Sequence, residues 1–156
     1  MSRKHFLSIL PGIFAVAFAL NANAQTSRKA VGAAEVNGTF RSYFSGKFKG
    51  SYNEIKILAL GKNKLKVRFD LTYPHIDGTG GLMANTGEAE GVAEINGDTA
   101  VYSTSDEYGK CAITIKFVKP GVIKVNEAAE ESDCGFGFNV SADGTYKKVS
   151  SVKPKF

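Results

Sequence analysis

Apolar and polar residues alternate most clearly in residues 65–73 of the chain. One set of alternate side chains is apolar, and the set between them is charged or polar. The apolar set is Leu65, Val67, Phe69, Leu71 and Tyr73, and the polar set is Lys66, Arg68, Asp70 and Thr72. A period of two with one apolar face is typical of a half-buried antiparallel strand.

Other short runs with strand-like composition are separated by turns rich in glycine, asparagine and aspartate. Together with 65–73, the predicted strands are 39–44, 54–60, 88–95, 99–103, 111–118, 122–126 and 145–150. Short strands at such regular spacing are typical of an all-β sandwich or barrel. We predict an all-β fold in which a single antiparallel meander of about eight strands closes into a small barrel, since closure removes exposed edges.

Two turns and one repeated motif support this meander. Asn96-Gly97 is a strong signal for a tight hairpin, and Pro120-Gly121 fits the centre of a type II turn. The sequence Asn-Gly-Thr-Phe at 37–40 is similar to Asp-Gly-Thr-Tyr at 143–146. That similarity suits pairing between the first and last strands, which would close the barrel.

The first 24 residues have the pattern of a cleaved signal peptide. A basic start is followed by the apolar residues 6–20 and by small residues up to a predicted cleavage between Ala24 and Gln25. The apolar stretch is shorter than the roughly 20 residues that span a bilayer, so we expect no membrane anchor after cleavage. The expected product is periplasmic or secreted, with a flexible lead-in at 25–36, a β-barrel domain at 37–151 and a basic tail at 152–156.

The charge of the chain is mildly basic, with a formal value of +5. Cleavage would remove Arg3 and Lys4 and leave 18 basic and 15 acidic residues, which is a formal charge of +3. The basic residues concentrate at the two ends of the mature chain, where solvated termini explain them better than nucleic-acid binding. We therefore expect no nucleic-acid partner and a monomeric protein.

Cys111 and Cys134 are the only cysteines of the chain. Two cysteines in an exported protein are typically bridged, and we predict a disulfide between them. A metal or redox role is not favoured, because there is no Cys-x-x-Cys motif and His75 is the only histidine left after cleavage. We expect neither a metal nor a cofactor.

The interior of the barrel is open to two interpretations, because about eight strands leave room for side chains or for one small ligand. The predicted strand at 88–95 places the small residues Ala89, Gly91 and Ala93 on one face. These residues either leave space for an apolar ligand or are covered by bulky side chains such as Phe69 and Phe117. Of the two, the packed interior is favoured.

No set of residues has the spacing of a catalytic centre. His75 and Asp77 lie in a glycine-rich loop, and no nucleophile is placed against the histidine. A short segment that ends at the second cysteine is crowded with acids, namely Glu127, Glu130, Glu131 and Asp133. An acidic loop held by a disulfide suits recognition of a basic protein partner better than catalysis.

The C-terminal third of the chain contains Cys-Gly-Phe-Gly-Phe-Asn-Val at 134–140 and Ala-Asp-Gly-Thr-Tyr-Lys-Lys at 142–148. It resembles a recurrent ending in small exported bacterial β-barrel proteins of unassigned function. The overall plan is similar to that of the periplasmic inhibitors of c-type lysozyme, which insert a Ser-Gly-x-x-Tyr loop into the lysozyme cleft. Here the corresponding loop has Ser45 and Gly46, with Lys49 at the tyrosine position and Tyr52 three residues further on.

These features predict an exported, non-enzymatic binding module, and the resemblance implies an inhibitor of a cell-wall-degrading glycosidase. Besides the acidic segment, the candidate partner-binding residues lie in the loops 45–52 and 73–81, and they are Ser45, Tyr52, Tyr73, His75 and Asp77. Two alternatives stay open, a lipocalin-like carrier of a small apolar ligand and a structural protein of the cell envelope.

Overall fold

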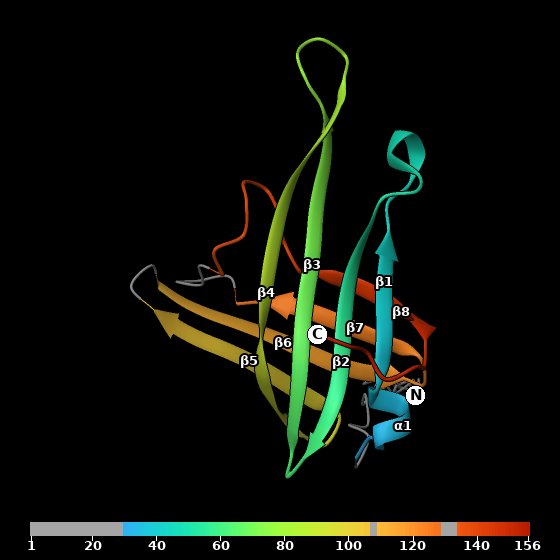
Figure 1. Cartoon of the computed structure of the whole chain (residues 1–156), viewed down its shortest axis with the longest axis vertical. Coiled ribbons are helices and arrows are strands. Elements are labelled where there is room, and N and C mark those ends of the chain that lie inside the picture. Colours follow the sequence, from blue (N-terminus) through green and yellow to red (C-terminus); the bar gives the residue numbers. More distant parts are fainter. Residues whose placement is uncertain (1–29, 107–108, 129–133) are drawn as a thin grey trace, which may run out of the picture.

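The computed structural model describes residues 30–106, 109–128 and 134–156 (Figure 1). No helix in these ranges has the length and apolar content needed to cross a membrane. The elements are α1 (Ala33–Val36), β1 (Gly38–Tyr43), the 3-10 turn η1 (Gly46–Phe48), β2 (Tyr52–Gly61), β3 (Lys64–Ile76), β4 (Leu82–Asn96), β5 (Thr99–Asp106), β6 (Gly109–Lys119), β7 (Val122–Glu127) and β8 (Gly144–Ser150).

The strands β1 to β8 form one closed ring of antiparallel pairs (Figure 1). Each strand pairs with the next one along the chain. At the seam, β1 pairs with β8, with Phe40 opposite Lys148 and Arg41 opposite Lys147. The predicted all-β meander and its closure into a barrel are therefore confirmed.

Alternate side chains of the strands fill the interior of the ring. In β3, the four residues Leu65, Val67, Phe69 and Leu71 are at most 3% exposed, as their spacing predicted. Tyr73 continues the same alternation but is 38% exposed, because β3 runs on into the hairpin that projects beyond the barrel (Figure 1). Tyr73 therefore lies on the predicted face of the strand but is not buried there.

Bulky side chains from several strands meet in the core. The largest fully buried ones are Tyr146, Phe40, Phe69, Phe117, Ile55, Ile57, Ile113, Ile115 and Ile123. Phe69 also packs edge-on against Tyr102, with the ring centroids 5.4 Å apart. These side chains build a packed interior.

The β3–β4 hairpin is longer than the sequence predicted. Residues 74–87 contain six glycines, alanines or prolines with few β-branched residues, and they were expected to form a loop between strands. In the structure all 13 residues of β3 pair with β4, and the loop is reduced to 77–81. Pairing along the neighbouring strand overrides weak strand propensity, which depends strongly on context.

Positive backbone angles mark two of the tight turns. Lys62 and Asn63 between β2 and β3 have φ angles of 49° and 58°, which match the two central positions of a type I′ turn. Gly121 between β6 and β7 has a φ angle of 74°, as expected for the third residue of a type II turn. The local chemistry of these turns therefore sets the register of the strands on either side.

The end of the expected lead-in forms α1, which is fastened to the last strand. The ammonium of Lys148 in β8 donates hydrogen bonds to the backbone oxygens of Ala34, Glu35 and Asn37, at 3.2, 2.5 and 2.8 Å. Val36 beside them is only 2% exposed. The N-terminal turn is therefore anchored to the base of the barrel.

Candidate functional site

The loops of the β1–β2 and β3–β4 hairpins lie at the same end of the molecule (Figure 1). The sequence predicted partner-binding residues in both loops, and the fold brings them to this one end. The β3–β4 hairpin reaches further out than its neighbours. Among the described residues, β4 pairs with β5 only from Ala93 to Asn96, so its first two-thirds stand clear of β5.

The tip of the β3–β4 hairpin exposes three large apolar side chains. Ile76, Leu82 and Met83 are 40%, 61% and 53% exposed. Ile76 lies opposite Leu82 in the ladder, and Met83 lies opposite His75. Neighbouring apolar side chains on a projecting element are typical of an interaction site. Sequence inspection missed them, because they were expected in a loop without regular structure.

Tyr73 and His75 lie together on the other face of the same hairpin from Ile76. Their rings stack with centroids 6.1 Å apart and an angle of 21° between planes. The His75 Nδ1 atom is 3.4 Å from the backbone oxygen of Tyr73. These contacts form a partly exposed aromatic surface on this face of the hairpin.

Asp77 organises the loop that connects the two strands. Its Oδ1 atom accepts hydrogen bonds from the Thr79 hydroxyl at 2.8 Å, from the Gly81 N–H at 2.7 Å and from the Thr79 N–H at 2.9 Å. The bond from the Thr79 hydroxyl, with the two backbone bonds, lowers the pKa of the Asp77 carboxyl. The carboxylate is therefore used inside the loop, where it fixes the shape of the tip.

The β1–β2 hairpin carries the remaining predicted residues. Ser45 is exposed and precedes η1. Tyr52 packs edge-on against Tyr43, with centroids 5.6 Å apart, and the Arg41 guanidinium lies 4.0 Å from the centroid of the Tyr52 ring. Alternation along the strands points Tyr52 to the outer face of the barrel wall and Tyr73 to the inner face. The two tyrosines therefore belong to different surfaces.

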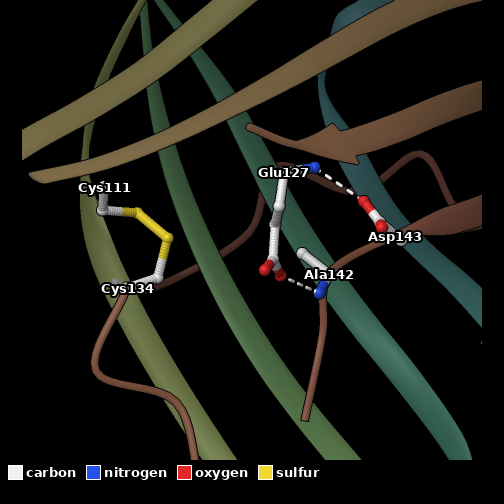
Figure 2. Close-up of a disulfide and its surroundings, with 5 residues drawn as sticks. All are labelled: Cys111, Glu127, Cys134, Ala142 and Asp143. Atoms are coloured by element: carbon white, nitrogen blue, oxygen red, sulfur yellow. Dashed lines mark hydrogen bonds between the residues drawn. A yellow bond between two sulfur atoms is a disulfide. The ribbon is translucent and has the colours of Figure 1, made fainter. Parts of the chain in front are cut away.

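The acidic segment is only partly described. Glu130, Glu131 and Asp133 lie outside the described residues, as does the predicted cleavage site at Ala24 and Gln25. Glu127 is half-buried, and its carboxylate accepts a hydrogen bond from the Ala142 N–H (Figure 2). The Glu127 N–H in turn donates to the Asp143 carboxylate at 2.6 Å. The Glu127 side chain thus joins the end of β7 to the chain before β8.

Residues 134–143, which we call the strap, run from the disulfide to the start of β8. The predicted disulfide joins Cys111 in β6 to Cys134 at the start of the strap, and it is confirmed (Figure 2). In the middle of the strap, the Gly137 N–H donates to the Thr86 backbone oxygen at 3.3 Å, and the Asn85 side chain donates to the backbone oxygen of Phe138 at 2.8 Å. The strap is therefore fastened to β4, where β4 has separated from β5.

Two glycines of β4 let aromatic rings pack directly against the backbone of the strand. A Cβ atom at Gly87 would lie 2.7 Å from the Phe136 ring, and one at Gly91 would lie 2.8 Å from the Tyr102 ring. Phe136 comes from the strap and Tyr102 from β5, so both rings seal the inner face of β4. Phe138, two residues further along the strap, is 80% exposed and takes no part in this contact.

Among the described residues, no group of three or more histidine, cysteine, aspartate or glutamate side chains has the geometry to hold a metal ion. Comparison of the chain with protein-family models, with curated proteins and with solved structures finds no significant match.

Proposed function

We propose that this protein is an exported, non-enzymatic binding module that engages a protein partner with the tip of its β3–β4 hairpin. The partner class that we propose is a cell-wall-degrading glycosidase, in keeping with the similarity in plan to the lysozyme inhibitors. The observation that carries the proposal is the projecting tip, which exposes Ile76 and Leu82 on one face and Met83 on the face of the stacked Tyr73 and His75.

The shape of the hairpin supports this function. Two strands form a narrow element that projects beyond the barrel (Figure 1), and glycosidases act in clefts that hold two carboxyl groups around the scissile bond. The tip is also well ordered, since Asp77 closes the loop and β3 pairs with β4 along its whole length. A rigid binding element loses little conformational entropy when the complex forms.

The packed interior favours binding at the surface over carriage of a ligand inside the barrel. Tyr102 covers Gly91, one of the small residues of β4 that were the reason to consider a cavity, and Phe136 covers Gly87, two residues before Ala89. Phe40, Phe69 and Phe117 are at most 1% exposed in the same core. The disulfide fits a protein that works in an oxidising compartment outside the cytoplasm.

The test is a cell-lysis assay with c-, g- and i-type lysozymes at stoichiometric amounts of the mature protein. We expect inhibition of at least one type, and we expect Leu82→Asp to weaken it at least about tenfold, because a charge would replace an apolar contact at the interface. Leu60→Asp is the matched control. Leu60 is 51% exposed against 61% for Leu82, and it lies near the opposite end of the barrel wall. Absence of inhibition of every lysozyme type would refute the proposed partner class.

The same assay also tests whether the acidic segment contributes to binding. Reversal of charge in the Glu130→Lys/Glu131→Lys variant is expected to slow association with a basic lysozyme, mainly at low salt. If inhibition depends on Leu82 and not on these glutamates, the hairpin tip binds the partner and the acidic segment does not. If both Leu82→Asp and Leu60→Asp inhibit as well as the wild type, the tip is not the site.

A further inference from the structure

The outer wall of the barrel carries a continuous chain of ion pairs across β1, β2, β3 and β4. It begins with Arg41 and Glu54, whose charged atoms are 2.6 Å apart. It continues through Lys56, which lies 3.4 Å from Glu54 and 3.5 Å from Asp70. Arg68 then lies 2.9 Å from Asp70 and 3.0 Å from Glu88 on β4, measured between the charged atoms.

All of these side chains except Arg41 line a groove of about 440 Å³ on the outer face of the wall. Its floor is formed by β3, with Arg68, Asp70 and Thr72. Tyr52 of β2 stands on one side, and Thr86 and Glu88 of β4 stand on the other. The groove therefore offers charged groups, hydroxyl groups and one aromatic ring within a single concave surface.

The charged groups of the groove are held in place and neutralise one another. The side chains of Glu54, Lys56, Arg68 and Asp70 are 12%, 28%, 32% and 28% exposed, which is low for ions on a barrel wall. Arg41 lies outside the lining of the groove but pairs with Glu54. Glu90, also outside it, lies 3.7 Å from Arg68 and pairs with Lys66 at 2.8 Å, so the whole network among the described residues holds four cations and four anions. Such a surface provides fixed hydrogen-bond donors and acceptors without a net charge, which suits a neutral polar ligand better than an ion.

Tyr52 supplies an apolar surface at the end of the groove. Its ring is held by Tyr43 and by the Arg41 guanidinium, and 37% of the residue stays exposed. A fixed aromatic ring beside polar groups matches a ligand that has both C–H faces and many hydroxyl groups. Pyranose sugars have both.

We propose that this groove is a binding site for a neutral oligosaccharide, with Tyr52 as the stacking ring and the polar side chains of β3 and β4 as hydrogen-bond partners. The site lies on the outer face of the wall, away from the apolar tip of the β3–β4 hairpin. It does not depend on the function proposed above, and either proposal stands if the other fails.

The test is a titration of the ¹⁵N-labelled mature protein with chitotetraose, cellotetraose and maltotetraose, followed by the backbone amide shifts. We expect at least one sugar to move the amides of Tyr52, Arg68, Thr72 and Thr86 in a saturable way. The affinity should change little between low and high salt, because a neutral ligand is not screened. Inorganic phosphate serves as the ionic probe. Shifts of these amides with phosphate and with none of the sugars would overturn the proposal, and so would the absence of any shift.

Two variants and one control locate the site. Tyr52→Ala is expected to weaken sugar binding at least about tenfold, the loss typical of an aromatic anchor. Thr86→Val removes one hydroxyl and keeps a residue that favours strands, so it should fold and bind several-fold more weakly. Phe138→Ala removes an 80% exposed aromatic ring outside the groove and should leave the affinity unchanged. Equal affinity of Tyr52→Ala, Thr86→Val and wild type would overturn the assignment.

Discussion

The two edges of β4 are held in different ways. Along one edge, β3 pairs with β4 from Lys64 to Ile76 without a register shift. Along the other edge, β5 pairs with β4 from Ala93 to Asn96, and beyond that point the strap and two aromatic rings cover the strand. Stability on the first edge is shared among many equivalent backbone bonds. On the second edge it depends on a few side chains and one covalent bond, so single substitutions should act strongly there.

Removal of the disulfide is expected to have the largest effect on the β5 edge. The Cys111→Ala/Cys134→Ala variant should lose roughly 3 kcal/mol of unfolding free energy, because the unfolded chain is no longer constrained by the crosslink. Urea denaturation of the variant and of wild type measures the difference. Wild type with its disulfide reduced should unfold at nearly the same urea concentration as the variant. A loss below about 1 kcal/mol would mean that the strap is held mainly by its noncovalent contacts.

Truncation of the ring on the strap should have the next largest effect. Phe136→Ala is expected to lower the unfolding free energy by about 2 kcal/mol, because a half-buried ring leaves a gap over Gly87. Phe138→Ala, two residues further on and 80% exposed, should change it by less than about 0.5 kcal/mol. Similar losses in both variants would contradict the assignment of Phe136 as the ring that seals β4.

A side chain added at Gly87 should destabilise the same contact between β4 and the Phe136 ring, this time from the β4 side. Gly87→Ala is expected to cost about 1–2 kcal/mol, since its Cβ would lie 2.7 Å from the Phe136 ring. Gly78→Ala in the hairpin loop is the control, because no atom lies within 4 Å of a Cβ built there. Combined with Phe136→Ala, the Gly87→Ala penalty should largely disappear, which a double-mutant cycle measures. A penalty that persists in the double mutant would have a different origin.

The smallest expected effect is local and lies on the β3 side, in the loop held by Asp77. The hydrogen bonds from Thr79 and Gly81 lower the pKa of Asp77 in the folded protein, so they stabilise the loop above the pKa of the unfolded chain. This contribution is lost as the pH falls through the lowered pKa, and protonation should loosen the loop. The amide shifts of Thr79 and Gly81 in an acid titration report it. The Asp77→Asn variant should show no such transition, while the β-barrel signals stay unchanged.

Much of the fold follows from local patterns in the sequence. The alternation in residues 65–73, the turn at Pro120-Gly121 and the similar motifs at 37–40 and 143–146 predicted the strands and the closure of the ring. The disulfide followed from the count of cysteines in a chain with a predicted signal peptide. Each of these signals lies within a few residues or depends on one global property.

The parts that the sequence did not predict depend on residues that are distant along the chain. Gly87 accepts the Phe136 ring, and the Glu127 carboxylate binds the Ala142 N–H, but no local pattern links either pair. The extension of β3 and β4 was missed because strand pairing, and not propensity, forms it. The apolar tip was missed for the same reason, since Leu82 and Met83 were expected in an irregular loop.

The pairing of β1 with β8 also has a consequence for the rate and order of folding. Synthesis completes β1 first, while the strand that covers its second edge comes last. The ring therefore closes through contacts between the two ends of the chain, and such nonlocal contacts fold slowly. Until β8 arrives, the backbone groups on the free edge of β1 are open to strands of other chains. A newly made chain should thus be most prone to aggregation in the interval before β8, from Gly144 to Ser150, is available.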